Sequence, residues 1–354
     1  MNNNGYFASM NTSEGFCSYF EEIFNSAQLD AVYIIKGGSG TGKSTTMKRI
    51  GEHFEKEGFL VERFFCSSDI SSLDGVIIDN RIAVIDGTSP HTTDPKYPGA
   101  VDEIVNLSSC WDADKLKKHK KEIIKLASEK GTCYRKGYSF LSAAGRIKRE
   151  MKSIVLENFK YDKMKRAISR YIKQNGWKGL KASHTLRHIT CVGPDGVTTF
   201  KTFENMSEKI CTVKNSHGCE GVFFTELIKQ FDEANLKSVI SYDPVCPENI
   251  NAVYLPDVRI CIVMSDGSEN PYDEKYKVFN LERFIDKETL ANNRSKLRFA
   301  NKCYKSLIDG ACDSFEDAKK CHGKIEKIYS SAVDFNIVSG IAEELIEKIS
   351  NIII

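Results

Sequence analysis

Long hydrophobic runs are missing from this sequence of 354 residues. No apolar stretch approaches the ~20 residues that a membrane-spanning helix needs. The first residues, MNNNGYFASM, also lack the basic segment and apolar core of a signal peptide. We therefore expect a cytoplasmic protein that has no membrane partner.

Cysteines at metal-binding spacing are missing as well. The chain has 12 cysteines, but no two of them are arranged as CxxC, which argues against a zinc site. A disulfide framework is not expected in a chain of this length without a secretion signal. Cys66, Cys211 and Cys261 lie inside apolar runs, where cysteine behaves as a small buried hydrophobic residue.

Charge is distributed unevenly along the chain. The net charge is only +2, yet residues 111–187 hold 22 Lys and Arg against 7 Asp and Glu, which leaves the remainder acidic. In this basic segment Arg135, Lys136, Arg146 and Arg149 would be able to close over a nucleotide, or to contact a nucleic acid backbone. A solvated helix face, or a surface that docks on the acidic second half, explains the segment more simply, because no nucleic-acid-binding motif accompanies the charge.

Apolar periodicity predicts alternating helices and strands, with a tight turn at Asp79-Asn80 and a linker over residues 175–183. The expected helices cover residues 6–24, 45–57 and 113–172, and the expected strands cover residues 31–35, 60–66, 76–78 and 81–85.

The strongest motif lies in residues 31–50, AVYIIKGGSGTGKSTTMKRI. An apolar strand, a glycine-rich turn and a helix follow one another, which is the context of the phosphate-binding pattern GxxxxGK[ST]. The turn directs backbone N–H groups at phosphates, and the helix N-terminus adds its positive dipole end. Lys43 would contact the β- and γ-phosphates, and Ser44 would complete the shell of Mg²⁺. The residues expected to bind the nucleotide are Gly37, Gly38, Ser39, Gly40, Thr41, Gly42, Lys43, Ser44 and Thr45.

Three polar residues that follow strand ends are further candidates. Asp86 is expected to hold Mg²⁺ through water, although aspartate also favours the opening of a turn. Asp69 is either a second metal ligand or a helix cap. His91 would orient or deprotonate an attacking water or sense the γ-phosphate, although a lone histidine in a loop often does neither. The catalytic candidates are therefore Lys43, Asp86 and His91.

The order of parts then repeats in the second half of the chain. Asp195-Gly196 parallels Glu14-Gly15, and residues 252–263 parallel residues 75–85. A repeat of this length indicates duplicated domains and not a solenoid. The second copy has NSHGCEGVF where the first has GGSGTGKS, and Met264 where the first has Asp86. We expect this copy to keep the fold without the phosphate loop.

Residues 31–91 resemble the P-loop NTPase superfamily, on Gly37, Gly42, Lys43, Ser44 and Asp86. The whole chain, with SSLDGVIIDNRIAVIDGTSPH in one half and an eroded copy in the other, resembles a family of bacterial tandem P-loop proteins described only as ATP-binding or ATPase-like. The resemblance implies an α/β fold with two P-loop NTPase-like domains, at residues 1–180 and 185–354. Each would have a mostly parallel sheet flanked by helices.

These observations predict a Mg·ATP-binding protein that hydrolyses ATP at a single site in its first half. ATP is the nucleotide expected by default, because Asn301-Lys302-Cys303-Tyr304 departs from the guanine-binding pattern Asn-Lys-x-Asp at its last position. A small-molecule kinase that uses the same site is one alternative, and a non-hydrolysing, ATP-dependent regulatory protein is another. The expected partners are the nucleotide and an unidentified small molecule or protein; nucleic acid is not favoured.

Overall fold

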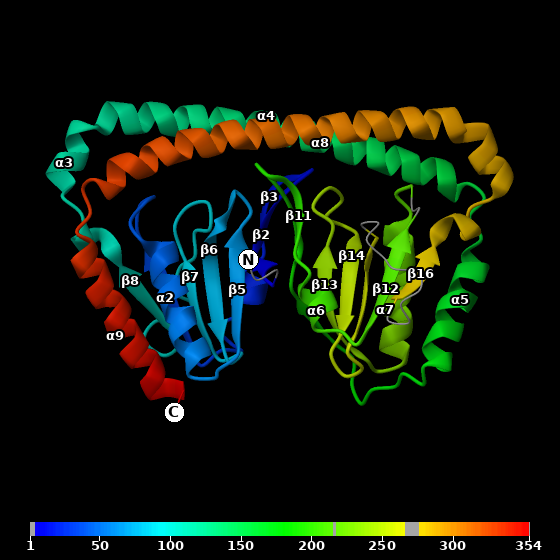
Figure 1. Cartoon of the computed structure of the whole chain (residues 1–354), viewed down its shortest axis with the longest axis horizontal. Helices are drawn as coiled ribbons and strands as arrows, with labels where there is room; N and C mark the ends of the chain where they lie inside the picture. The colour runs from blue at the N-terminus through cyan, green and yellow to red at the C-terminus, as the bar shows by residue number, and fades with distance from the viewer. Residues whose placement is uncertain (1–3, 215–216, 266–275, 354) are drawn as a thin grey trace.

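The computed structural model describes residues 4–214, 217–265 and 276–353. Two sheets of six strands stand side by side beneath a pair of long helices that span both of them (Figure 1). This bears out the α/β class with mostly parallel sheets flanked by helices. No helix in the described part of the chain is long and apolar enough to cross a membrane.

The first sheet has the strand order β1-β5-β6-β7-β4-β8. All of its strands run in one direction except β6, which is antiparallel to both neighbours. Asp79 and Asn80 have φ values of 52° and 55° and form the tight turn predicted between β6 and β7. The strands are β1 (Tyr6–Phe7), β4 (Ala31–Lys36), β5 (Val61–Cys66), β6 (Asp69–Ile78), β7 (Ile82–Asp86) and β8 (Asp102–Asn106).

The second sheet repeats this arrangement as β9-β13-β14-β15-β12-β16, with β14 as the reversed strand. The register also repeats, because Val213 pairs with Met264 as Ile35 pairs with Asp86. The strands are β9 (Ser183–Leu186), β12 (Lys209–Lys214), β13 (Lys237–Tyr242), β14 (Ile250–Leu255), β15 (Ile260–Met264) and β16 (Tyr276–Asn280).

Two long helices join the halves. The first sheet continues through η1 (Leu107–Cys110) and α3 (Ala113–Lys118) into α4 (Lys120–Leu156), which reaches across to the second sheet. The second sheet continues through η2 (Leu281–Phe284) into α8 (Lys287–Ser330), which returns along α4. Leu141 and Ala144 of α4 are buried with Ala311 and Phe315 of α8. We call this pair of helices the crossbar.

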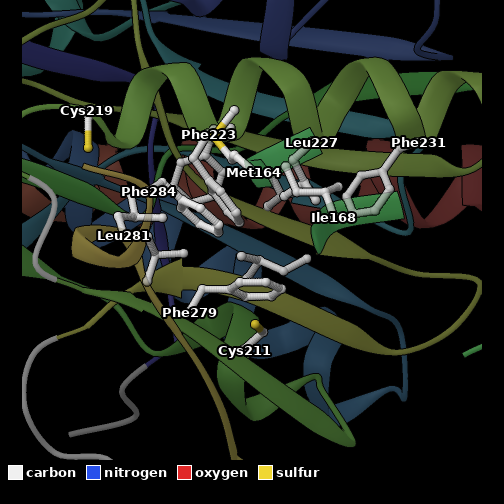
Figure 2. Close-up of a cluster of buried hydrophobic side chains, with 14 of the residues drawn as sticks. Met164, Ile168, Cys211, Cys219, Phe223, Leu227, Phe231, Phe279, Leu281 and Phe284 are labelled. Carbon is white, nitrogen blue, oxygen red and sulfur yellow. The ribbon is translucent and has the colours of Figure 1, made fainter. Parts of the chain in front are cut away.

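Each sheet is covered by one helix of its own half and one helix delivered by the crossbar. The first sheet packs against α2 (Lys43–Lys56) and α9 (Phe335–Ile353), whose Leu345 and Ile349 lie in its core. The second packs against α7 (Glu220–Glu233) and α5 (Tyr161–Gln174), whose Met164 and Ile168 meet Phe223 and Leu227 of α7 (Figure 2). Each core therefore contains chain from both sides of residue 180.

The helix predicted over residues 6–24 is wrong. This segment forms β1, then a hairpin of β2 (Ser9–Thr12) and β3 (Gly15–Ser18), and only a single helical turn, α1 (Phe20–Ile23). Gly15, with φ 105°, makes the hairpin turn. The aromatic residues that suggested a helix face different partners: Tyr19 contacts His188, whereas Phe24 contacts Phe64. The helical spacing of these aromatic residues was thus coincidental.

A matching hairpin, β10 (Thr190–Gly193) and β11 (Gly196–Thr199), stands opposite in the second half, before α6 (Thr202–Asn205). Between the halves, Phe7 stacks on Phe200 at 4.9 Å, and the Phe7 N–H donates to the His188 carbonyl at 2.8 Å. Glu62 accepts hydrogen bonds from the Arg187 guanidinium at 2.7 to 3.1 Å. The halves therefore share a core as well as the crossbar.

Candidate functional site

The segment between β4 and α2 has the backbone that the glycines permit. Gly40 and Gly42 have φ values of 68° and 87°, which an L side chain adopts only with strain. Gly42 is the N-cap residue of α2, and it has no side chain to cap the first N–H groups of the helix. Those donors, and the positive end of the helix dipole, are consequently available to an anion.

Lys43 lies at the centre of this loop. Its Nζ donates to the carbonyls of Gly37 at 2.9 Å and Gly38 at 2.8 Å, and it lies 3.5 Å from Asp86 Oδ2. The Lys43 and Asp86 side chains are only 11% and 17% exposed. Because Ile35 pairs with Asp86 in the parallel register, the sheet itself holds the carboxylate beside the loop. The structure thus brings these two predicted residues together.

Thr88 also belongs to this arrangement, although sequence reasoning did not single it out. Its Oγ1 donates to the Gly37 carbonyl at 2.9 Å, and its N–H donates to Asp86 Oδ1 at 2.8 Å. The hydroxyl therefore links the loop after β7 to the beginning of the glycine-rich loop between β4 and α2. The sequence feature that indicates Thr88 is its position two residues after Asp86 in the run DGTSPH.

Ser44 Oγ lies at the start of α2 and accepts a hydrogen bond from the Leu73 N–H of β6 at 2.9 Å. Thr41, by contrast, turns back on its own loop and donates to the Gly38 carbonyl at 2.8 Å.

Asp69 is at the far end of β6, where its carboxylate accepts hydrogen bonds from Ser71 and Ser72 and pairs with Lys319 of α8 at 3.2 Å. Burial raises the pKa of Asp69, but the hydrogen bonds from Ser71 and Lys319 bring it below the ordinary value. Asp69 is therefore engaged with the crossbar.

His91 is enclosed rather than open to solvent. Its ring is 7% exposed, stacks on Phe20 at 4.7 Å, and places Nε2 3.4 Å from Asp74 Oδ2. Burial raises the pKa of Asp74, the nearby His91 opposes that rise, and the charge of Asp86 adds to it. Sequence reasoning missed Asp74, whose signal was a carboxylate inside the apolar strand SSLDGVII. The His91–Asp74 pair lies behind the site, in contact with Ser9 of the hairpin.

The end of the crossbar lies directly on the glycine-rich loop between β4 and α2. A Cβ added to Gly38 would come within 2.7 Å of the Tyr329 ring, and one added to Gly40 within 2.7 Å of the Glu326 carbonyl. These glycines thus allow α8 to approach the loop. The hydrogen bond from His322 lowers the pKa of Glu326, and the charge of Lys43 lowers it further. Lys130 of α4 lies beside these two side chains, with its Nζ 3.4 Å from His322 Nδ1.

Elsewhere in the basic segment, Lys148 and Arg149 are among the residues that contact acids of the second half. Lys148 Nζ lies 2.6 Å from Glu220 Oε1 and also pairs with Asp243. Arg149 pairs with Glu248 at 2.8 Å, and with Glu14 of the first hairpin at 3.3 Å. These contacts are of the kind predicted for a docking surface. The Arg135 guanidinium is exposed and donates to Thr132 Oγ1 of its own helix at 2.8 Å.

At the equivalent end of the second sheet the charges are reversed. Glu220, not lysine, is the first residue of α7, and Met264 ends β15. Its partner Lys148 is on α4, whereas in the first half Lys43 is the first residue of α2 and the acid contributed by the crossbar is Glu326 of α8. The carboxylate of Glu220 thus already supplies an anion at the start of α7.

The oxygen atoms of Ser44 and Asp86 beside the loop are ligands that suit a hard cation. Among the described residues there is no group of three or more His, Cys, Asp or Glu side chains with metal-holding geometry. Mg²⁺ does not need one, because it keeps several waters and phosphate oxygens and takes one or two oxygens from the protein. Ser44 Oγ and the Asp86 carboxylate are oxygens of this type at the mouth of the loop.

Comparisons with models of protein families, with curated proteins and with solved structures find no match to this chain.

Proposed function

We propose that the first sheet binds Mg·ATP at a P-loop and hydrolyses it by attack of water on the γ-phosphate. The observation that carries the proposal is the convergence at one sheet edge of an uncapped helix N-terminus, the largely buried Lys43 and the Asp86 carboxylate. A buried cation held by backbone carbonyls is ready to exchange them for phosphate oxygens, which are stronger acceptors.

In this proposal, each group has a defined task. Lys43 moves from the Gly37 and Gly38 carbonyls to the β- and γ-phosphates, and the loop N–H groups bind the remaining phosphate oxygens. Ser44 and Asp86 hold Mg²⁺, which neutralises charge that develops on the phosphate when it is bound. Thr88 keeps Asp86 oriented through its N–H. His91, which is enclosed with Asp74, supports the loop after β7 and does not contact the attacking water.

We further propose that the halves arose by duplication and that the second has lost this chemistry. The support is the common strand order, together with the replacement of Lys43 by Glu220 and of Asp86 by Met264 at matching positions. A carboxylate in place of the lysine repels phosphate and leaves the second sheet unable to bind a nucleotide in the same way.

One observation favours the regulatory alternative. Glu326 and Tyr329 of α8 rest on Gly40 and Gly38, so a nucleotide that alters the loop also acts on the helix that leads to the second sheet. In that case ATP binding, and not its turnover, would be the functional event.

The decisive experiment compares wild type with Lys43→Ala in thermal unfolding with and without Mg·ATP. Saturation at about 100 times the Kd stabilises a protein by about 2.7 kcal/mol, and Lys43→Ala should abolish that gain. Lys56→Ala, at the opposite end of α2, is the matched control and should keep it. An unchanged shift in Lys43→Ala contradicts the site.

Phosphate release from ATP, measured on the same proteins, separates the functions. Steady release that requires Lys43 supports hydrolysis. Release only in the presence of added metabolites, with label transferred to one of them, indicates a kinase. Stabilisation without release under either condition indicates a regulatory protein.

A further inference from the structure

A cavity of about 590 Å³ lies over the carboxyl edge of the second sheet, beneath the crossbar. The apolar part of its wall comes from α4, β15 and α8, with Met151, Met264, Leu290 and Leu297, and charged side chains line much of the rest. Cavities of this size with apolar walls and a few convergent polar groups are typical of small-molecule sites. It occupies the place in the second half that the phosphate loop occupies in the first.

One end of the cavity is closed to phosphate. Glu220 contributes its carboxylate there and pairs with Lys148 at 2.6 Å, and both side chains are largely buried. A nucleotide polyphosphate would meet this carboxylate at the position that Lys43 has in the first half, and the like charges would repel.

The opposite wall carries two arginines. Arg294 and Arg298 line the cavity from α8, and their spacing of four residues places them on one face of the helix. Neither has a carboxylate within ion-pair distance in the described ranges of the chain, whereas other ionisable side chains of the lining form pairs, Lys148 with Glu220 and His217 with Glu282. Tyr304, which also lines the cavity, is half-buried, and burial raises its pKa to about 12, so its hydroxyl stays protonated as a donor.

We propose that this cavity binds a small organic anion that has an apolar or aromatic body. The body lies against Met151, Leu290 and Leu297, and the anionic group accepts hydrogen bonds from the Arg294 and Arg298 guanidiniums. This site is distinct from the proposed ATP site and does not depend on it, because its residues come from the second sheet and the opposite end of the crossbar.

The test uses anilinonaphthalene sulfonate, a fluorescent probe with an aromatic body and one anionic group. Titration of the wild-type protein should give one saturable site with enhanced fluorescence. The double variant Arg294→Ala/Arg298→Ala should weaken binding by at least about tenfold, since each lost charge-assisted hydrogen bond costs more than a neutral one. Lys296→Ala, an exposed cation of α8 outside the cavity lining, is the matched control and should bind as wild type does.

A second variant tests the cavity independently of its charge. Ala291 is exposed at the cavity wall, so Ala291→Trp should fold normally and fill the entrance with an indole ring. It should reduce the number of bound probe molecules while both arginines remain. Probe binding that is not saturable, or that survives in both the double variant and Ala291→Trp, overturns the proposal. Lys43→Ala should leave probe binding unchanged, which keeps this test separate from that of the ATP site.

Discussion

Glu326 of α8 is the acidic residue that the crossbar contributes beside the proposed phosphate site. Its backbone rests on Gly40, and its carboxylate interacts electrostatically with Lys43 and Asp69. Bound phosphate would bring additional negative charge to the same place. In the present arrangement of the crossbar, the Glu326 carboxylate would therefore oppose the proposed binding of a nucleotide.

Replacing Glu326 with Gln should consequently tighten Mg·ATP binding by about three- to tenfold, as expected for one like-charge interaction of about 1 kcal/mol. Isothermal titration calorimetry measures the change. Glu316→Gln, on the same helix but paired with Lys320 at 3.0 Å, is the control and should not alter the Kd. Equal affinity for Glu326→Gln and wild type would mean that Glu326 does not sense the phosphates.

His188 is the residue whose titration should control stability. It is fully buried between the halves, its Nδ1 accepts the Tyr242 N–H at 3.2 Å, and burial, together with Arg187, lowers its pKa to about 3. The unfolded chain binds a proton near pH 6.5, where the folded protein does not. Between those values the unfolded state holds more protons, so stability rises with pH.

We therefore expect the stability contributed by neutral His188 to be complete above about pH 6.5 and to fall by up to about 1.4 kcal/mol per pH unit below it, until about pH 3. Urea unfolding at pH 7, 6 and 5 measures the slope. His188→Gln cannot titrate, and its slope over this range should be smaller by that amount. Identical slopes would show that His188 is not the group responsible.

At the scale of elements, Gly137 of α4 lies where the two helices of the crossbar pack closely together. A Cβ at this position would come within 2.4 Å of the Phe315 ring of α8. Helix propensity favours alanine over glycine, but the contact leaves no room for a methyl group. Packing between the two helices therefore decides which residue is tolerated.

Gly137→Ala should destabilise the protein by about 1 to 3 kcal/mol in spite of the better propensity. Gly131→Ala on the same helix, where the nearest atom is Arg135 Nη1 at 3.6 Å, should stabilise it by up to about 1 kcal/mol. Chemical denaturation of both variants gives the comparison. A stabilising Gly137→Ala would indicate that α4 and α8 separate easily in solution.

At the scale of the whole molecule, the halves exchange helices. The first sheet is covered by α9, which the chain reaches only after the second sheet, and the second is covered by α5, which precedes it. A further core, with Phe7 and Phe200, lies between them. Neither sheet can bury its faces without elements that are attached through the crossbar.

The chain should therefore unfold as one cooperative unit although it has two sheets. Differential scanning calorimetry should give a single transition whose calorimetric and van't Hoff enthalpies agree. Leu345→Ala in α9 leaves a cavity in the first core and should lower the midpoint of that one transition as a whole. Two separate transitions, only one of which responds to Leu345→Ala, would contradict the shared cores.

The local sequence was sufficient for the parts that depend on neighbouring residues. The strand and helix predicted at residues 31–35 and 45–57 are present in the structure, and so is the turn predicted at Asp79-Asn80. These predictions succeed because β-branched runs, helix periodicity and turn residues act over a few positions. Parallel sheet order also made the approach of Asp86 to the loop predictable, since strand ends in such a sheet share one edge.

Only the tertiary structure decided what lies around that loop. The burial of His91 against Asp74, the hairpin in place of a helix over residues 6–24, and the docking of Glu326 and Tyr329 on the glycines all depend on residues far away in the chain. Such contacts form when apolar surfaces from different elements are buried together, and no local pattern records which partner an element will meet. The sequence by itself determined a strand, a glycine-rich turn and a helix with Lys43 at its start; the exchange of helices between the halves determined what covers them.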